Sequence, residues 1–309
     1  MGKIMRDRRH KNSVSVFSVA VPALLLFAIG GVLSAKVGLL DDLDASVDTR
    51  VEAPVTVTIE PRRMEYRAEG HFIKNGFAVD APLVDATLSK PFRIMKYQVS
   101  RTDYQRCVEA GACEKGEPAA SLGNDTPMTG VNYTDASNYA AWLTEKTGEV
   151  WRLPTDRQWA FAAGRKFPDD ALGIDGSKDN PALRWLADYE RESTRQKSKN
   201  PMPQASGTFG ENEFGVADLD GNVWEWTQTC HRRVTVGENG EVLKEAPACG
   251  IYVVDGKHRA SMSFFIRDPK SGGCAVGVPP DNLGFRLVRD DRWYAKMLYA
   301  FERRFPGAV

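Results

Sequence analysis

Two stretches of the chain show the two-residue alternation of apolar and polar positions that is typical of strands. Residues 55–59 form a β-branched run, and residues 92–99 repeat the pattern. The segment 232–243 contains Asn239-Gly240, a strong hairpin-turn signal. Residues 165–214 follow no period and are rich in charged and turn-forming residues, which predicts long surface loops. We therefore expect short strands and one hairpin, separated by extended loops.

Other stretches follow the helical period. The first predicted helix runs over residues 101–108, after a cap that begins at Ser100. A second is expected over residues 134–146, starting at the Thr-Asp pair, with Gly148 as its stop. A third begins at a cap formed by Thr155 or Asp156. Helices and strands thus mix along the chain, which indicates an α+β class.

The beginning of the chain has the pattern of a membrane anchor. Residues 1–12 are basic, residues 13–35 carry no charge, and residues 36–52 form an acidic linker. An uncharged run of this length can span a bilayer as a single helix, and a basic flank favours the cytoplasmic side. We favour an uncleaved transmembrane signal anchor over a signal peptide cleaved near Ala35. Both interpretations place the folded part in the periplasm, either anchored to the bacterial inner membrane or free.

The end of the chain, residues 293–309, predicts an amphipathic helix. Tyr294, Met297, Leu298, Phe301 and Phe305 fall at helical spacing. Such a helix either packs on its own domain or offers a docking surface for a partner subunit or the membrane interface.

Composition adds few restrictions. The 309 residues are 42% hydrophobic, enough for a sizeable core. Forty-one basic residues balance 41 acidic ones, and no basic patch with interleaved aromatic residues occurs. The charge pattern therefore gives no reason to expect a nucleic-acid partner.

The five cysteines suggest an oxidising compartment. Cys107 and Cys113 flank a Gly turn after a short helix, and Cys230 and Cys249 bracket the predicted hairpin, so we predict these two disulfides. Cys274 is left over, either as a buried thiol or as part of a different pairing, because sequence alone does not fix the connectivity.

The stretch Gly215–Trp226 contains the most distinctive chemistry. Its carboxylates at Asp218 and Glu225 bracket a Gly-Asn turn, so side-chain and backbone oxygens can converge on a hard cation, for which calcium is suited. Trp224 and Trp226 would share one face of an extended segment, with Glu225 on the other. The same residue types also suit an ordinary tight turn.

This stretch resembles the signature of the formylglycine-generating-enzyme family, also called the sulfatase-modifying-factor domain. Further blocks match in the family's order, at residues 92–104, 127–142, 152–159 and 284–286. The resemblance covers residues 53–292. It implies a mixed α/β, C-type-lectin-like fold with little regular secondary structure, here preceded by one transmembrane helix. It also implies a structural calcium ion at Asp218, Gly221, Val223 and Glu225.

The copper chemistry of the resembled enzymes is not expected here. Those enzymes bind copper through two cysteines that follow an Arg-Gly-Gly-Ser-Trp block, whereas the corresponding segment, residues 258–267, contains no cysteine. Thiolates are the ligands that select Cu(I). Cys274 remains as a candidate catalytic residue, and it would need a second ligand such as His258 or Met262. The His-x-x-x-His-x-Glu motif of the family's iron-dependent branch is also missing, so neither copper nor iron is expected.

The pattern is most similar to a third branch of exported maturation proteins, in particular the NirV type encoded beside copper nitrite reductase. We therefore expect an accessory protein for a periplasmic redox enzyme, with a copper nitrite reductase as candidate client. The candidate binding cleft comprises Trp224, Arg259, Ser261 and Arg286, although both arginines can instead be buried partners of loop carboxylates. A calcium-braced lectin-like binding module and an oxidase with an unfamiliar metal site are the alternatives.

Overall fold

The computed structural model describes residues 51–118, 123–169, 171, 202–219, 221–270 and 282–305. The chain divides into a larger compact unit, residues 47–295, and a smaller one that groups residues 1–46 with residues 296–309. Within the described ranges, no helix has the length and apolar character needed to cross a membrane. The predicted anchor, Cys274 and most of the predicted loop region at 165–214 lie outside the described residues.

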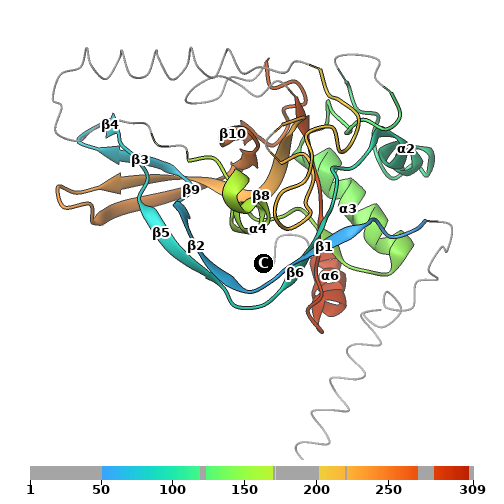
Figure 1. The fold of residues 1–309 in the computed structure, drawn as a ribbon, viewed down its shortest axis with the longest axis horizontal. Coiled ribbons are helices and arrows are strands. Elements are labelled where there is room, and N and C mark those ends of the chain that lie inside the picture. The colour runs from blue at the N-terminus through green and yellow to red at the C-terminus, as the bar shows by residue number, and fades with distance from the viewer. Residues whose placement is uncertain are drawn as a thin grey trace, which may run out of the picture. The chain divides into compact units, whose positions relative to one another are not determined.

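The larger unit is a mixed α/β structure dominated by sheets (Figure 1). One sheet has four strands in the order β1 (Thr56–Ile59), β6 (Phe92–Met95), β12 (Val288–Arg289) and β7 (Trp151–Arg152). All of its neighbouring strands are antiparallel. Strands from both ends of the domain are therefore hydrogen-bonded side by side.

A second sheet is built around a long hairpin. Its strand order is β10 (Ala260–Ser263), β9 (Val242–Asp255), β8 (Trp224–Val236), β3 (His71–Lys74) and β4 (Phe77–Ala78). The short strand β11 (Leu283–Gly284) runs parallel to the start of β8. The hairpin turns at Asn239-Gly240, as predicted, and Gly240 adopts a φ of 82° that a residue with a side chain rarely adopts. A separate ribbon pairs β2 (Arg62–Arg67) with β5 (Leu83–Leu88).

The three predicted helices are present and have local capping signals. α2 (Arg101–Glu109) starts after Ser100, and α4 (Asp156–Ala163) starts after Thr155 and leads into the short 3-10 helix Gly164–Lys166. α3 (Tyr133–Thr147) begins slightly before the predicted Thr-Asp pair. Its cap is Asn132, because that side chain accepts from the backbone N–H of Asp135 while the Asp135 carboxylate accepts from the N–H of Asn132.

The four-stranded sheet is buried on both faces. Ile94 and Val288 point to one face, where they pack with the aromatic and alanine residues of α4. Met95, the next residue of β6, and Leu287, directly before β12, point to the other face and join the core beneath α2 and α3. The predicted strand at 92–99 ends early as β6, at Met95, but Val99 still donates to the carbonyl of Phe285. The result is a double core that fixes the loops between strands.

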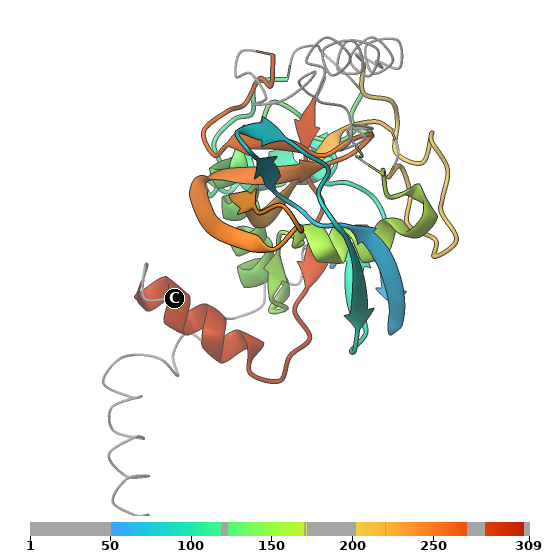
Figure 2. The same ribbon diagram turned by 90° about the vertical axis from the view of Figure 1, so that its left-hand side faces the viewer.

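The described part of the smaller unit contains all but the first residue of one helix, α6 (Ala295–Arg304), drawn in red in Figure 2. It lies within the stretch predicted to form an amphipathic helix.

Candidate functional site

The signature stretch enters β8 with its aromatic and acidic side chains on opposite faces. Trp224 and Trp226 are 5% and 0% exposed and belong to the core beneath α3. Their ring N–H groups donate to the carbonyls of His258 and Val131. Trp224 is thus a buried residue of this core.

Glu225 faces away from this core and forms a buried ion pair with Arg286. Both side chains are fully buried, and Nε of Arg286 lies 2.6 Å from Oε2 of Glu225 while Nη2 lies 2.7 Å from Oε1. The two remaining acceptor positions of the carboxylate are filled by Trp159 Nε1 at 2.9 Å and Gln98 Nε2 at 2.8 Å. This bidentate geometry is the strongest form of a carboxylate–guanidinium contact.

Arg286 also holds three backbone carbonyls. It donates to Met95 at the end of β6, to Lys96 directly after it, and to Ala217 in the signature loop. Glu225 and the carbonyls together use all of the N–H groups of the guanidinium. Of the two interpretations given for Arg286, the buried arginine paired with a loop carboxylate describes the structure, and Arg286 does not line an open cleft.

Asp218 stabilises the other side of the same loop. It is fully buried and has a φ of 58°, a left-handed conformation that Asp tolerates better than most residues. Its carboxylate accepts from the backbone N–H groups of Gly207, at 2.6 Å, and Phe209, at 2.8 Å. Asn222, also left-handed, exchanges two hydrogen bonds with the backbone of Gln204. Side chains of the signature thus fix the segment 204–209.

These contacts bear on whether the candidate ligands fit a calcium ion. The acceptor capacity of Glu225 is used by four protein donors, and the positive charge that balances it is Arg286. A divalent cation beside Glu225 would have to displace that guanidinium, so the arrangement of Asp218, Gly221, Val223 and Glu225 does not fit calcium while the pair is intact. Calcium in this loop stays a prediction, and no step below depends on it.

The remaining candidates lie at the start of β10. Arg259 pairs with the buried Asp156 at 3.4 Å, at the first turn of α4. Ser261 Oγ lies 2.8 Å from Nδ1 of His231 on β8. No sequence signal predicts this contact, because both are ordinary strand residues. Burial, and secondarily the nearby His71, lower the pKa of His231, so its ring is neutral at pH 7. These pairs link β10 to α4 and β8.

The segment after β10 is held by a cluster of carboxylates. Arg267 donates to Asp135 at 2.8 and 3.0 Å, to Glu117 at 2.8 Å and to Glu114 at 2.8 Å. These hydrogen bonds raise the pKa of the Arg267 guanidinium, with that from Asp135 contributing most. Phe264 adds two backbone hydrogen bonds, to Gly250 and from Tyr133. The segment that corresponds to the copper site of the resembled enzymes is therefore fixed by structural contacts.

This fixed segment exposes apolar surface. Phe264 and Phe265 are 44% and 61% exposed and pack edge to face. Met262, proposed as a second ligand for Cys274, is 1% exposed in the core. The two predicted disulfides, Cys107–Cys113 and Cys230–Cys249, are both present, so four of the five cysteines are not free thiols.

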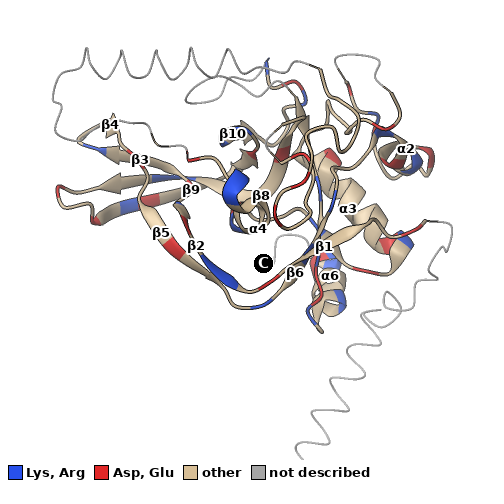
Figure 3. Ribbon diagram, in the orientation of Figure 1, with Lys and Arg blue, Asp and Glu red and all other residues tan. Residues whose placement is uncertain are grey.

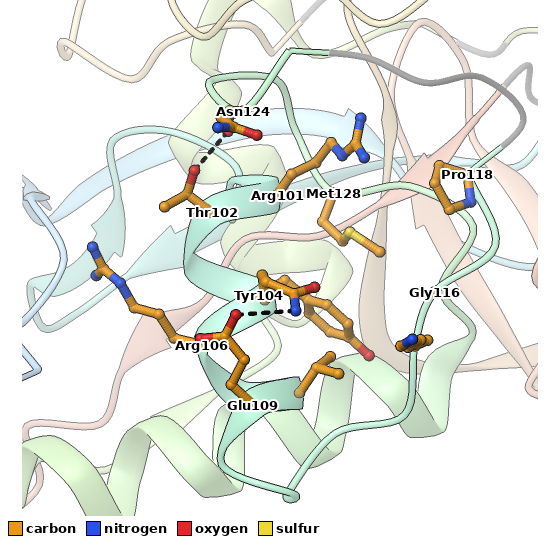
Figure 4. Close-up of a pocket in the computed structure, with 12 residues that line it drawn as sticks. Arg101, Thr102, Tyr104, Arg106, Glu109, Gly116, Pro118, Asn124 and Met128 are labelled. Carbon is orange, nitrogen blue, oxygen red and sulfur yellow. Dashed lines mark hydrogen bonds between the residues drawn. The ribbon is translucent and has the colours of Figure 1, made fainter.

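A separate cavity of about 430 Å³ opens beside α2 (Figure 4). Its wall is formed by α2 and the loop that follows it, where Thr102 donates to the carbonyl of Asn124 and Gln105 donates to Glu109. None of the predicted site residues lines it. Its described lining is mixed in charge, and no buried, unpartnered polar group within that lining points to a ligand.

The fold and the signature loop can now be compared with known proteins. The family described as "Sulfatase-modifying factor enzyme 1-like domain" matches residues 43–291. The chain belongs to this family. As the resemblance implied, the described part of this family member is a mixed α/β, sheet-dominated structure with few helices.

Relatives within the sulfatase-modifying factor family differ in activity. The "Inactive C-alpha-formylglycine-generating enzyme 2" of Mus musculus is 26% identical over 169 residues, covering 53% of this chain and 49% of the relative. The "Formylglycine-generating enzyme" of Mycobacterium tuberculosis is 31% identical over 107 residues, covering 33% of each. The chain thus spans half or less of these relatives. The solved structure of PvdO from Pseudomonas aeruginosa shares the fold, with a TM-score of 0.51, 22% identity, and coverage of 77% of this chain and 95% of that one.

Proposed function

We propose that this member of the sulfatase-modifying factor family recognises a client protein and does not generate formylglycine. The segment 258–267 carries this proposal. It stands where the resembled enzymes have their copper cysteines, contains no cysteine, and exposes Phe264 and Phe265 from a backbone held by Arg267. Rigid aromatic pairs of this kind serve as anchors at the centres of protein interfaces.

We propose a periplasmic redox enzyme as the client, with a copper nitrite reductase as the first candidate. The chain would act as the membrane-anchored accessory protein of that enzyme. Two disulfides support an oxidising compartment, and the uncharged residues 13–35 support an anchor in the bacterial inner membrane. The inactive mammalian relative supports a role without oxidation of a sulfatase cysteine.

In-cell photocrosslinking from the aromatic pair tests this function. A photoreactive phenylalanine analogue is placed at Phe265 of the full chain, and a matched variant carries it at Phe77, an exposed aromatic residue on β4. We expect one dominant crosslinked protein from position 265 and none from position 77. Identical products from both positions, or none from position 265, would contradict the proposal.

A chemical assay separates this function from the oxidase alternative. The purified full chain is incubated with copper, oxygen and a cysteine-containing sulfatase peptide, with an active formylglycine-generating enzyme as control. We expect no aldehyde product. Aldehyde formation that is lost in a Cys274→Ser variant would instead establish an unfamiliar catalytic site.

A further inference from the structure

Helix α6 presents its largest apolar side chains to solvent. Trp293, two residues before the helix, is 88% exposed. Met297 and Phe301 in the helix are 49% and 38% exposed, and Phe305, directly after it, is 42% exposed. They recur every four residues, and Met297 and Phe301 lie on one face of the helix between the other two. These four side chains are called the apolar stripe below. The fully covered positions are instead Ala295 and Ala300, at 2% and 3% exposure, and the larger Leu298 and Tyr299 are half-buried. An ordinary helix that packs on its own domain has the opposite arrangement.

The charged residues of α6 are mainly basic (Figure 3). Lys296, Arg303 and Arg304 stand against Glu302 as the one acidic residue of the helix. Basic residues beside a Trp- and Phe-containing apolar stripe are typical of helices that lie in the headgroup region of an anionic bilayer. Ten residues, the length of α6, are too few to span one.

We propose that α6, together with Trp293, lies in the interface of an anionic membrane and holds the folded domain close to the bilayer. The same chain contains a segment that would attach it to a membrane, since residues 13–35 form an uncharged run long enough to span a bilayer. Anchored at that run, α6 meets the lipid surface at high effective concentration, so that even a weak interfacial helix is bound. The inference shares the anchor with the proposed function but is independent of any client.

Trp293 provides the signal for a direct test. The full chain is inserted, one copy per lipid nanodisc, into discs of phosphatidylcholine alone or of equal parts phosphatidylcholine and phosphatidylglycerol, each with or without brominated chains. The Trp293 contribution is the difference between the wild type and Trp293→Phe, which separates it from the other tryptophans. We expect quenching by the brominated lipid in the anionic discs and much less in the neutral ones.

Variants then test the two halves of the helix surface. Met297→Ser with Phe301→Ser is expected to abolish the quenching, whereas Leu83→Ser, an equally exposed apolar residue on β5, leaves it unchanged. Each of Lys296→Gln and Arg304→Gln is expected to lower the ratio of membrane-bound to free helix roughly fivefold, following the contribution of one basic residue at an anionic surface.

Other occupants of the stripe give different results. Equal quenching in neutral and anionic discs would show a lipid contact to which the basic residues contribute nothing, and would overturn the proposal of an anionic interface. A Trp293 blue shift that grows with protein concentration in detergent would show a second copy, with the same consequence. If the chain does not insert, the anchor is wrong, and the quenching is measured with added vesicles. Binding to anionic vesicles would still support α6, and its absence would refute it.

Discussion

Replacing Arg286 with Met is the sharpest test of how the signature loop is stabilised. The substitution leaves the Glu225 carboxylate, which is fully buried, without a positive partner and removes donors from three carbonyls. Removing one member of a buried pair costs about 3–5 kcal/mol, because an uncompensated charge remains in the interior. For a domain of this size, we therefore expect the melting temperature to fall by about 6–20 °C.

Two further variants test whether the unpaired charge of Glu225 causes the loss of stability. Glu225→Gln combined with Arg286→Met is expected to be more stable than Arg286→Met alone, since no charge is then left buried. Arg106→Met breaks an ion pair at the surface, in which the side chains of Arg106 and Asp103 are 53% and 46% exposed. This variant is expected to lose less than about 1 kcal/mol of stability. Thermal unfolding of the full chain, followed by tryptophan fluorescence, measures all three.

Two outcomes would refute this reasoning. One is a loss for Arg286→Met no larger than that for Arg106→Met, which would mean that water or relaxation compensates Glu225. The other is an equal loss of wild-type stability when EGTA is added, which would show that a bound cation balances Glu225. Elemental analysis of the purified chain then decides whether that cation is calcium, as the resemblance implies.

Three other perturbations have expected outcomes. Cys230→Ser should cost about 3 kcal/mol, since the disulfide closes a loop with a sequence separation of 19. Dithiothreitol, which can also reduce Cys107–Cys113, should destabilise the wild type at least as much in thermal unfolding. Arg267→Gln should cost about 1.5–3 kcal/mol and increase hydrogen exchange over 263–267, whereas Glu117→Gln, at the exposed end of the cluster, should change both little. Folding lowers the pKa of His231, so the stability that neutral His231 contributes is present above its ordinary pKa and is lost as pH falls below about 6.5. Between pH 7.5 and pH 5, the His231→Gln variant should therefore lose less stability than the wild type, as measured by thermal unfolding.

Local sequence signals predicted the elements that have local causes. Ser100 and Thr155 are caps whose side chains accept from the third residue of the following helix, and Gly148 ends α3 in a left-handed conformation at φ 68°. Each of these signals acts within a few residues, so it is readable without knowing the fold. The same holds for the hairpin turn at Asn239-Gly240. The start of α3 was predicted one residue late, because Thr134 and Asp135 suit a cap as well as Asn132 does.

The partners of the candidate site could not be predicted in this way. Glu225 and Arg286 are 61 residues apart, and they meet because β11 pairs in parallel with the first two residues of β8. A strand of two residues is too short to have a recognisable sequence pattern. The contact between Ser261 and His231 likewise depends on the order of three strands and on an irregular register near Cys230. Resemblance located the loop, but contacts across the fold decide what its side chains do.

The signature match therefore carries information about folding that is separate from chemistry. Trp224 and Trp226 build the core, Glu225 fixes Arg286, and Arg286 holds carbonyls of two other segments. Asp218 and Asn222 fix a third segment through its backbone. All of these roles are satisfied in a chain whose segment 258–267 has no copper-binding cysteine. A sequence can thus match the signature for structural reasons alone, and the activity of each family member has to be argued from that segment and from the surface it exposes.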